Sequence, residues 1–447
     1  MRDPIPSPVS GAYRAVWRWH FYAGLLVMPV LMLMALTGAI YLFRAEIEDA
    51  VYRPLAEVRP AATTTSPDRW AAAARVAGGG EVASVLMPDR PDRAVRFTVR
   101  RPDESQVFVF VDPSDAQTTG VAPAGGVTET VKRIHSLEIV GRWGNLLVEV
   151  VAGWAMILVA TGVFLWWPRR RVAGVVTVRA RAGRPFWRDL HAVTGLYAGA
   201  VIFFLAFTGM PWSGVWGDAI LGQMRASGIG RPATPPAASP WEHAQHKADE
   251  PGGVGWTMEG ATMATPAHHA APSLERVVDT ANRSALARPW LISVPASPDL
   301  AWAVARQPTR VEDTRTLYVD GVTGDVRADI RYRQFGWGAK AFEWGIATHQ
   351  GTQYGAINRW VMLSGCVAVW LLAISGLVMW WRRRPSGGLG APAAPPGPRV
   401  RAAVLGIVIP FSIIYPLTGL SLLAAILIDR TAAAIRRRFA ISERTAP

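Results

Sequence analysis

Trp17-Arg18-Trp19-His20 is followed by a stretch from Phe21 to Phe43 that contains no charged side chain. An uncharged run of this length can cross the ~30 Å hydrocarbon core of a bilayer as an α-helix. His20 opens the run, and an ionisable side chain within a membrane is costly enough to be a functional hypothesis by default. The stretch therefore predicts a membrane helix whose histidine has a function.

The same arrangement occurs again in the second half of the chain. A glycine and a threonine, Gly24 and Thr37, follow His20, and the same two residue types follow His191 at identical intervals. A parallel internal repeat is the simplest explanation, and it implies a pseudo-twofold axis along the membrane normal. We expect small residues of the repeat to allow close helix approach, namely Gly24, Gly38, Gly195 and Gly209.

A second pair of histidines has its own matched register. His135 precedes Gly141, Gly162 and the pair Trp166-Trp167, and His349 precedes Gly355, Gly376 and the pair Trp380-Trp381 at identical intervals. Each half of the chain therefore contains, in order, a histidine, a membrane span, a large domain, a second histidine and a second membrane span. This order predicts a four-helix bundle with one helical hairpin per half.

Hydrophobic residues make up half of the 447 residues and are concentrated in blocks. We expect five spanning or near-spanning segments, at 21–43, 146–167, 192–217, 360–381 and 402–428. The first run is too long for the apolar part of a cleaved signal peptide and is better explained as a signal-anchor. Only the fifth is ambiguous, because Pro410 and Pro416 can break or kink a helix. It would form a single crossing or a hairpin, and its length slightly favours the crossing.

The formal charge of +14 could suggest nucleic acid, but the distribution of charge argues against it. Residues 45–143 carry 12 basic and 14 acidic side chains, and residues 217–348 carry 13 and 14. The excess lies in two short loops, 168–190 with seven Arg and 382–401 with five. Short basic loops stay in the cytoplasm. We therefore expect the two large segments to lie outside the cell membrane, in a multi-pass membrane protein.

The expected fold is a membrane α-helical bundle of four helices with a fifth C-terminal hydrophobic segment and two α+β external domains. The expected boundaries are 1–44 for the cytoplasmic start and first span, 45–143 for the first domain, 144–168 for the second span, 169–189 for a basic loop, 190–216 for the third span, 217–348 for the second domain (226–272 a flexible linker), 349–381 for the fourth span, 382–401 for a second basic loop, 402–429 for the fifth segment and 430–447 for a tail.

Local patterns predict the elements of the two domains. We expect helices at 67–77 and 273–285, the latter capped by Ser273, strands at 95–99, 107–111, 300–305 and 316–319, and turns at 112–115 and 320–325.

Topology assigns the repeated histidines to two depths. His20 and His191 would lie at the cytoplasmic ends of their spans, and His135 and His349 at the external side. A planar macrocycle between two helices can take one axial imidazole from each, and histidine is a common axial ligand of haem iron. We expect two non-covalent b haems, one in each leaflet, which together would carry electrons across the membrane. Arginines near the histidines in sequence are candidates to pair with haem propionates: Arg18 and Arg188 inside, and Arg133, Arg142 and Arg359 outside.

Simpler explanations compete with these assignments. One interfacial histidine is usually a polar anchor, and a duplication copies any feature, functional or not. His243, His246, His268 and His269 lie in the linker and could bind a metal, but a solvated linker is the preferred interpretation. The Trp pairs could relay electrons, but aromatic belts at the membrane interface are commoner.

Several other chemistries have no sequence signal here. The chain has no Walker loop, no Gly-rich dinucleotide motif and no nucleophile elbow. Its one cysteine, Cys366, lies in an apolar span, so neither an internal disulfide nor haem attachment through a Cys-x-x-Cys-His motif is possible. We therefore expect the electron donor to be a separate cytoplasmic reductase or a membrane quinol.

Four stretches resemble the PepSY-associated transmembrane family: Trp17 to Leu25, Phe186 to Gly199, His135 with Gly141 to Asn145, and Val319 to Asp325. The resemblance covers about 14–384. It implies two PepSY-like periplasmic domains, transmembrane histidines that hold haem, and reduction of a ferric siderophore. By matching motif, the ligand roles fall on His20, His135, His191 and His349.

Two rival functions fit the same outline. Parallel repeats also build permeases for siderophores or metals, but such a protein would need polar residues in mid-span, and the runs between the histidines are almost wholly apolar. A periplasmic binding or regulatory module would keep its partner after all four histidines were replaced.

Overall fold

The computed structural model describes residues 8–167, 176–230, 262–266, 270–297, 299–382, 405–406 and 409–442. The chain divides into two compact units, each built from separate pieces of sequence. The helical unit comprises Met1–Ala39, Arg133–Ile220 and Trp360–Pro447. The sheet unit comprises Ile40–Lys132 and Leu221–Arg359 and contains every strand among the described residues.

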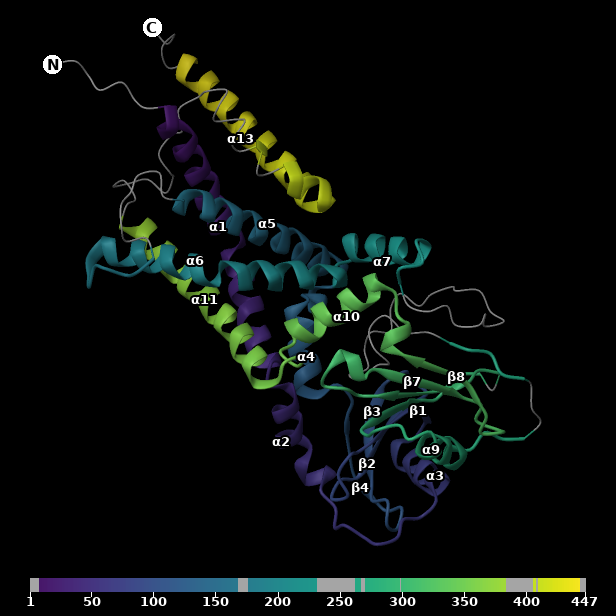
Figure 1. The fold of residues 1–447 in the computed structure, drawn as a ribbon. Helices are drawn as coiled ribbons and strands as arrows, with labels where there is room; N and C mark the ends of the chain where they lie inside the picture. The colour runs from purple at the N-terminus through teal and green to yellow at the C-terminus, as the bar shows by residue number, and fades with distance from the viewer. Residues whose placement is uncertain are drawn as a thin grey trace, which may run out of the picture. The chain divides into compact units, whose positions relative to one another are not determined.

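Four helices in the described residues are long and apolar enough to cross a membrane (Figure 1). They are Tyr13–Tyr41 of α1 (Pro8–Tyr41), α5 (Arg142–Trp166), Gly183–Trp212, which joins α6 (Gly183–Gly209) to the 3-10 turn η2 (Met210–Trp212), and α11 (Gly355–Trp381). A helix satisfies its backbone hydrogen bonds within itself, as a spanning segment in lipid must. Four of the five expected apolar segments thus form helices of spanning length.

Glycines let helices of the helical unit pack closely. A Cβ on Gly365 of α11 would lie 2.7 Å from Val201 Cγ1 of α6, closer than real Cβ contacts. A Cβ on Gly153 of α5 would clash with the hydroxyl of Thr418 in α13 (Pro416–Ser442). These contacts bring small residues to helix interfaces, as membrane bundles commonly do.

The fifth apolar segment is helical in its described parts, at 409–414 and again from Pro416 in α13. Pro416 lacks a backbone N–H and so suits the first position of a helix. The apolar portion, Pro416–Ile428, is shorter than the ~20 residues that a crossing helix needs. A fifth crossing therefore stays a prediction.

The sheet unit contains one antiparallel sheet of eight strands in the order β4-β3-β2-β1-β5-β6-β7-β8. The strands are β1 (Glu81–Met87), β2 (Val95–Arg100), β3 (Gln106–Val111), β4 (Thr118–Pro123), β5 (Trp290–Ser293), β6 (Trp302–Arg306), β7 (Arg315–Val319) and β8 (Val326–Arg331). This confirms strands at the four expected places. We expected two separate domains, but the structure has one shared sheet. Residues 45–143 contribute β1 to β4, and residues 217–348 contribute β5 to β8. Pairing β1 with β5 satisfies backbone groups that two separate sheets would leave open at their edges.

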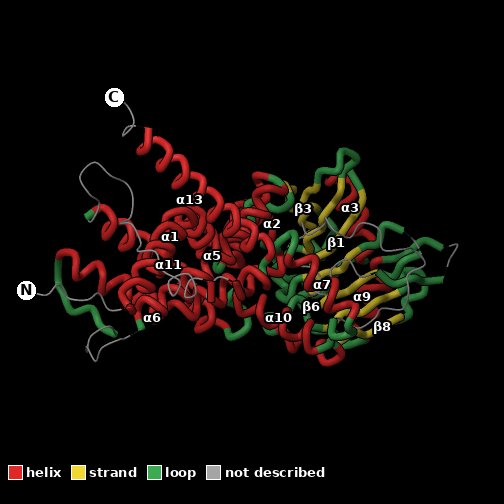
Figure 2. Tube along the Cα trace, turned by 90° about the horizontal axis from the view of Figure 1, so that it is seen from above, coloured by secondary structure: helices red, strands yellow, loops and turns green. Residues whose placement is uncertain are grey.

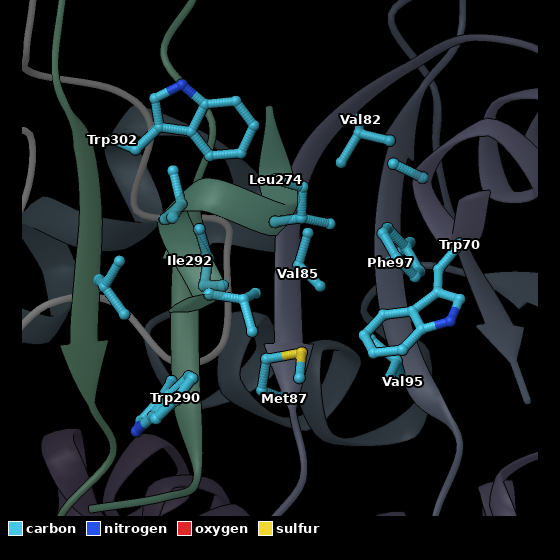
Figure 3. Close-up of a cluster of buried hydrophobic side chains, with 14 of the residues drawn as sticks. Trp70, Val82, Val85, Met87, Val95, Phe97, Leu274, Trp290, Ile292 and Trp302 are labelled. Atoms are coloured by element: carbon cyan, nitrogen blue, oxygen red, sulfur yellow. The ribbon is translucent and has the colours of Figure 1, made fainter. Parts of the chain in front are cut away.

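Helices cover one face of the sheet, where α3 (Pro67–Gly78) and α9 (Leu274–Arg283) pack on the strands (Figure 2). Their residues join strand residues in one buried cluster, including Trp70, Phe97, Leu274 and Trp290 (Figure 3). Both helices were expected, and Ser273 caps α9 as predicted by accepting a hydrogen bond from the backbone N–H of Arg276.

The opposite face of the sheet is also buried. Along β3, Val107, Val109 and Val111 belong to the cluster under α3 and α9, whereas Phe108 and Phe110 pack with Tyr52 of α2 (Arg44–Ala56). Strands covered on both faces read as continuous apolar runs, which is why Val107–Val111 was recognisable in the sequence. The remaining elements are α4 (Gly126–His135), η1 (Glu138–Val140), α7 (Trp216–Ala226), η3 (Val311–Asp313), η4 (Tyr332–Gln334) and α10 (Trp337–His349).

The two expected aspartate turns have the same construction. Asp112 Oδ1 accepts from the backbone N–H of Ser114 at 2.8 Å, and Asp320 Oδ1 accepts from that of Val322 at 2.9 Å. Each aspartate carboxylate thus closes the turn that it begins, as Asx turns do.

Candidate functional site

A cavity of about 960 Å³ lies within the helical unit, and α1, α5, α6 and α11 all contribute to its wall. This volume is at the upper end of the ~300–1,000 Å³ typical of small-molecule and cofactor sites. Leucine, valine and other apolar side chains form most of the wall. Five glycines also line it: Gly24, Gly162, Gly195, Gly199 and Gly376.

Two of these glycines have a different role from the one expected. A Cβ on Gly24 or Gly195 would lie 3.8 or 3.7 Å from a leucine methyl group, which is ordinary van der Waals contact. Close helix packing therefore does not require glycine at either position. Their absent side chains instead leave room along the cavity wall.

His20 and His191 meet in this cavity. Their ring centroids are 6.3 Å apart, and the ring planes are inclined by 85°. With metal–imidazole bonds of about 2.0–2.1 Å and a ring centroid about 1 Å beyond the ligating nitrogen, two imidazoles on opposite sides of one metal have centroids about 6 Å apart. The observed separation is compatible with two imidazoles that hold one metal ion, and it also lies within the range of about 4.5–7 Å of an ordinary aromatic pair.

A hydroxyl group fixes the orientation of the His20 ring. His20 Nδ1 lies 2.8 Å from Thr161 Oγ1, and that hydroxyl donates its proton to the carbonyl of Ile157 at 2.7 Å. A hydroxyl has one proton to donate, so Thr161 acts as the acceptor toward the ring. This arrangement favours a proton on His20 Nδ1, which would leave the lone pair on Nε2.

His191 has the same surroundings on the other half of the bundle. Its Nδ1 lies 3.0 Å from Ser375 Oγ, and Ser375 donates to the carbonyl of Leu371 at 2.6 Å. The same argument places the lone pair of His191 on Nε2. Both rings thus present the nitrogen that a metal could bind.

His135 ends α4 and contacts α1. Its Nδ1 lies 3.0 Å from Thr37 Oγ1, which donates to the carbonyl of Leu33 at 2.8 Å. Burial lowers the pKa of His135, and the carbonyl of Met34 opposes this shift only in part. A lowered pKa favours the neutral imidazole, the ligating form of histidine.

His349 ends α10 in the sheet unit, whereas His135 belongs to the helical unit. The structure brings together the pair His20 and His191, and the pairing of His135 with His349 stays a prediction.

The linker histidines lie outside the described residues. Among the described residues, no group of three or more His, Cys, Asp or Glu side chains could hold a metal ion.

Positive charge gathers at the cavity wall. Arg188, a predicted propionate partner, is among the lining residues, together with Arg14, Arg179 and Arg184. The buried carboxylate of Asp189 accepts a hydrogen bond from Arg188 at 2.7 Å and lies 3.6 Å from Arg179. From the sequence, Arg179 and Arg184 were assigned only to membrane orientation, and their place in the wall was missed.

Two other predicted arginines have different surroundings. Arg18 is not among the lining residues, and its guanidinium lies 5.6 Å from the ring centroid of Tyr22. Arg359 forms an ion pair with Glu46 within the sheet unit. Neither contact supports the propionate role expected for these two residues.

A family model described as the PepSY-associated TM region matches residues 17–383. The match spans more than half of the chain and includes His20, His135, His191 and His349. The comparison with curated proteins finds no significant match.

Proposed function

The chain belongs to the PepSY-associated TM family, and from this premise we propose that it is a haem-containing electron-transfer enzyme of the bacterial inner membrane. Its substrate would be a ferric chelate, such as a ferric siderophore, in the periplasm. The observation that carries the proposal is that His20 and His191 meet in a cavity of cofactor size.

The donor set favours a macrocycle over a metal ion held by protein alone. Metal sites built only from side chains commonly use three or four ligands, and the described residues offer no such group. An iron in a porphyrin needs only axial ligands from the protein. Two imidazoles with their lone pairs on Nε2 meet that need.

Each part of the site would have a separate task. His20 and His191 would supply neutral nitrogen ligands, and the apolar wall would exclude water. The arginines at the wall would pair with the carboxylates of the cofactor. Bound haem b would supply a one-electron couple at its iron.

The overall reaction balances with a donor of either expected class. A quinol that is oxidised to quinone releases two electrons and two protons, and two Fe(III) chelates each gain one electron to become Fe(II). A cytoplasmic reductase would supply the same electrons singly. Chelators with hard oxygen donors hold Fe(II) less tightly than Fe(III), so reduction would favour release of iron.

The test is the haem content of the protein purified from haem-sufficient cells. We expect a reducible haem band, and we expect His20→Ala and His191→Ala each to lower the haem-to-protein ratio by about one, measured as the pyridine complex. His243→Ala, in the segment expected to be a linker, is the matched control and should keep the full ratio. Reduction of a ferric chelate, followed with an Fe(II)-selective dye, should fall with haem content. A wild-type protein without a haem band would overturn the proposal.

A further inference from the structure

We propose that a hydroxyl-glycine pair positions each of three histidines for metal binding, an inference that rests on the proposed function. The pairs are Thr161-Gly162 beside His20, Ser375-Gly376 beside His191, and Thr37-Gly38 beside His135. In each pair the hydroxyl holds Nδ1 of the ring, and the glycine leaves room for the adjacent ring carbon.

The hydroxyl groups act as acceptors because their own protons are already used. Thr37, Thr161 and Ser375 each donate to a carbonyl in the preceding turn of their own helix, at 2.8, 2.7 and 2.6 Å. All three residues are buried, with at most 5 % of their surface exposed, so water does not compete for the ring. This arrangement favours the Nδ1–H tautomer of each histidine.

The glycines lie against the neighbouring edge of the same rings. A Cβ on Gly162 would lie 3.5 Å from His20 Cε1, and one on Gly376 would lie 3.6 Å from His191 Cε1, so alanine would make ordinary van der Waals contact there and only a larger side chain would meet the ring. On Gly38 the corresponding distance to His135 Cε1 is 3.2 Å, tighter than most real contacts. A branched side chain at these positions would push the ring away from the hydroxyl that orients it.

The chemical consequence concerns ligand strength and ring orientation. A partner on the second ring nitrogen fixes the tautomer of a metal-bound histidine, and loss of such a partner typically weakens metal affinity about 10–100-fold. A hydroxyl is too weak a base to remove the ring proton, unlike a carboxylate, so the ligands stay neutral imidazoles. Thr161 and Ser375 are thus positioning residues, which act through His20 and His191.

The experiment compares Thr161→Val and Ser375→Ala with the wild type in the full-length protein. We expect each variant to bind haem about 10–100-fold more weakly, with a shifted midpoint potential, and Thr161→Ser to restore both values. Ser364→Ala is the matched control, because Ser364 is exposed on α11 and its hydroxyl donates to the carbonyl of Val361 rather than toward a histidine. Thermal unfolding of the haem-free proteins separates positioning from general stability.

A second readout needs no haem. Histidine-selective ¹⁵N NMR of the haem-free protein should show His20 as the Nδ1–H tautomer in the wild type and a mixture of tautomers in Thr161→Val. If the wild type binds haem and Thr161→Val matches it in affinity, potential and tautomer, this inference is wrong while the proposed function stands. If the wild type binds no haem, the proposed function fails independently of the tautomer result.

Discussion

A single carboxylate interrupts the apolar sequence of α5, and the structure gives it a partner. Glu149 is fully buried, and its Oε2 accepts hydrogen bonds from the backbone N–H groups of Val215 and Trp216, each at 3.2 Å. These groups lie at the start of α7, where helix amides have no partner within the helix. The charge that breaks the hydrophobic run therefore serves as a cap for another helix.

Replacement of Glu149 should destabilise the helical unit by an amount that depends on the acceptor. Glu149→Ala removes the acceptor of two part-buried backbone amides, so we expect a loss of about 1–3 kcal/mol. Glu149→Gln keeps one oxygen acceptor and should cost less than the alanine variant. Thermal unfolding in detergent measures both variants. Equal melting temperatures for wild type and Glu149→Ala would show that the cap contributes nothing.

At the same scale, the sequence located the histidines but not their partners. His20 and His191 were recognisable because their register repeats and because a titratable group in an apolar run is unusual. Thr161 and Ser375 are common residues in membrane helices, so their type alone carries no signal. The available signal was that each directly precedes a glycine of the matched register, Gly162 or Gly376.

Among the elements, α3 and α9 exchange their N-terminal caps. Asp68 of α3 accepts from the backbone N–H of Leu274 at 2.7 Å and from the hydroxyl of Ser273, also at 2.7 Å. In return, Ser66 donates to the carboxylate of Glu275 in α9 at 2.6 Å. Carboxylates near helix N-termini are favourable, so each helix start stabilises the other.

This exchange predicts that Asp68 matters to both helices. Asp68→Ala removes an acceptor from the first turn of α9, and loss of a helix cap typically costs about 0.5–2 kcal/mol. Asp279→Ala, on the exposed side of α9, is the matched control and should change stability little. Chemical denaturation followed by circular dichroism distinguishes the two. If the two variants unfold at the same denaturant concentration, the exchange does not stabilise the sheet unit.

Boundaries of elements were harder to predict than their existence. The fourth span was expected to begin at His349, but α10 ends there and α11 begins at Gly355. Gly351 and Gly355 adopt positive φ angles of 74° and 62°, a conformation that glycine accepts readily and that interrupts a helix. The matched register continues through this turn, so the sequence pattern alone could not show the break.

At the scale of the whole molecule, the repeat was visible in sequence but its assembly was not. Val95–Val99 and Val107–Val111 were predicted from their runs of β-branched and aromatic residues. The strands β1, β4, β5 and β8 were missed, and the pairing of β1 with β5 from Ser84–Ser293 to Met87–Trp290 joins segments from opposite halves of the chain. Sequence patterns report which face of a strand is buried, but they do not identify a partner that distant.

Membrane orientation is the property of the whole chain that most directly tests the function. Between the first and second spans lies 45–143, and between the third and fourth lies 217–348, so both must lie on one side if all four helices cross. Basic loops should stay in the cytoplasm, which predicts that the sheet unit faces the periplasm. A reductase of external ferric chelates requires this orientation.

Single-cysteine labelling tests the orientation in cells. Cys366 is the one native cysteine and is buried, so Cys366→Ala gives a background without thiols. Gln117→Cys and Thr177→Cys then place one thiol at an exposed position of the sheet unit and of the first basic loop, respectively. In spheroplasts, a membrane-impermeant maleimide should label position 117 at once and position 177 only after detergent is added. The reverse order would place the sheet unit in the cytoplasm and remove the physical basis for reducing an external chelate.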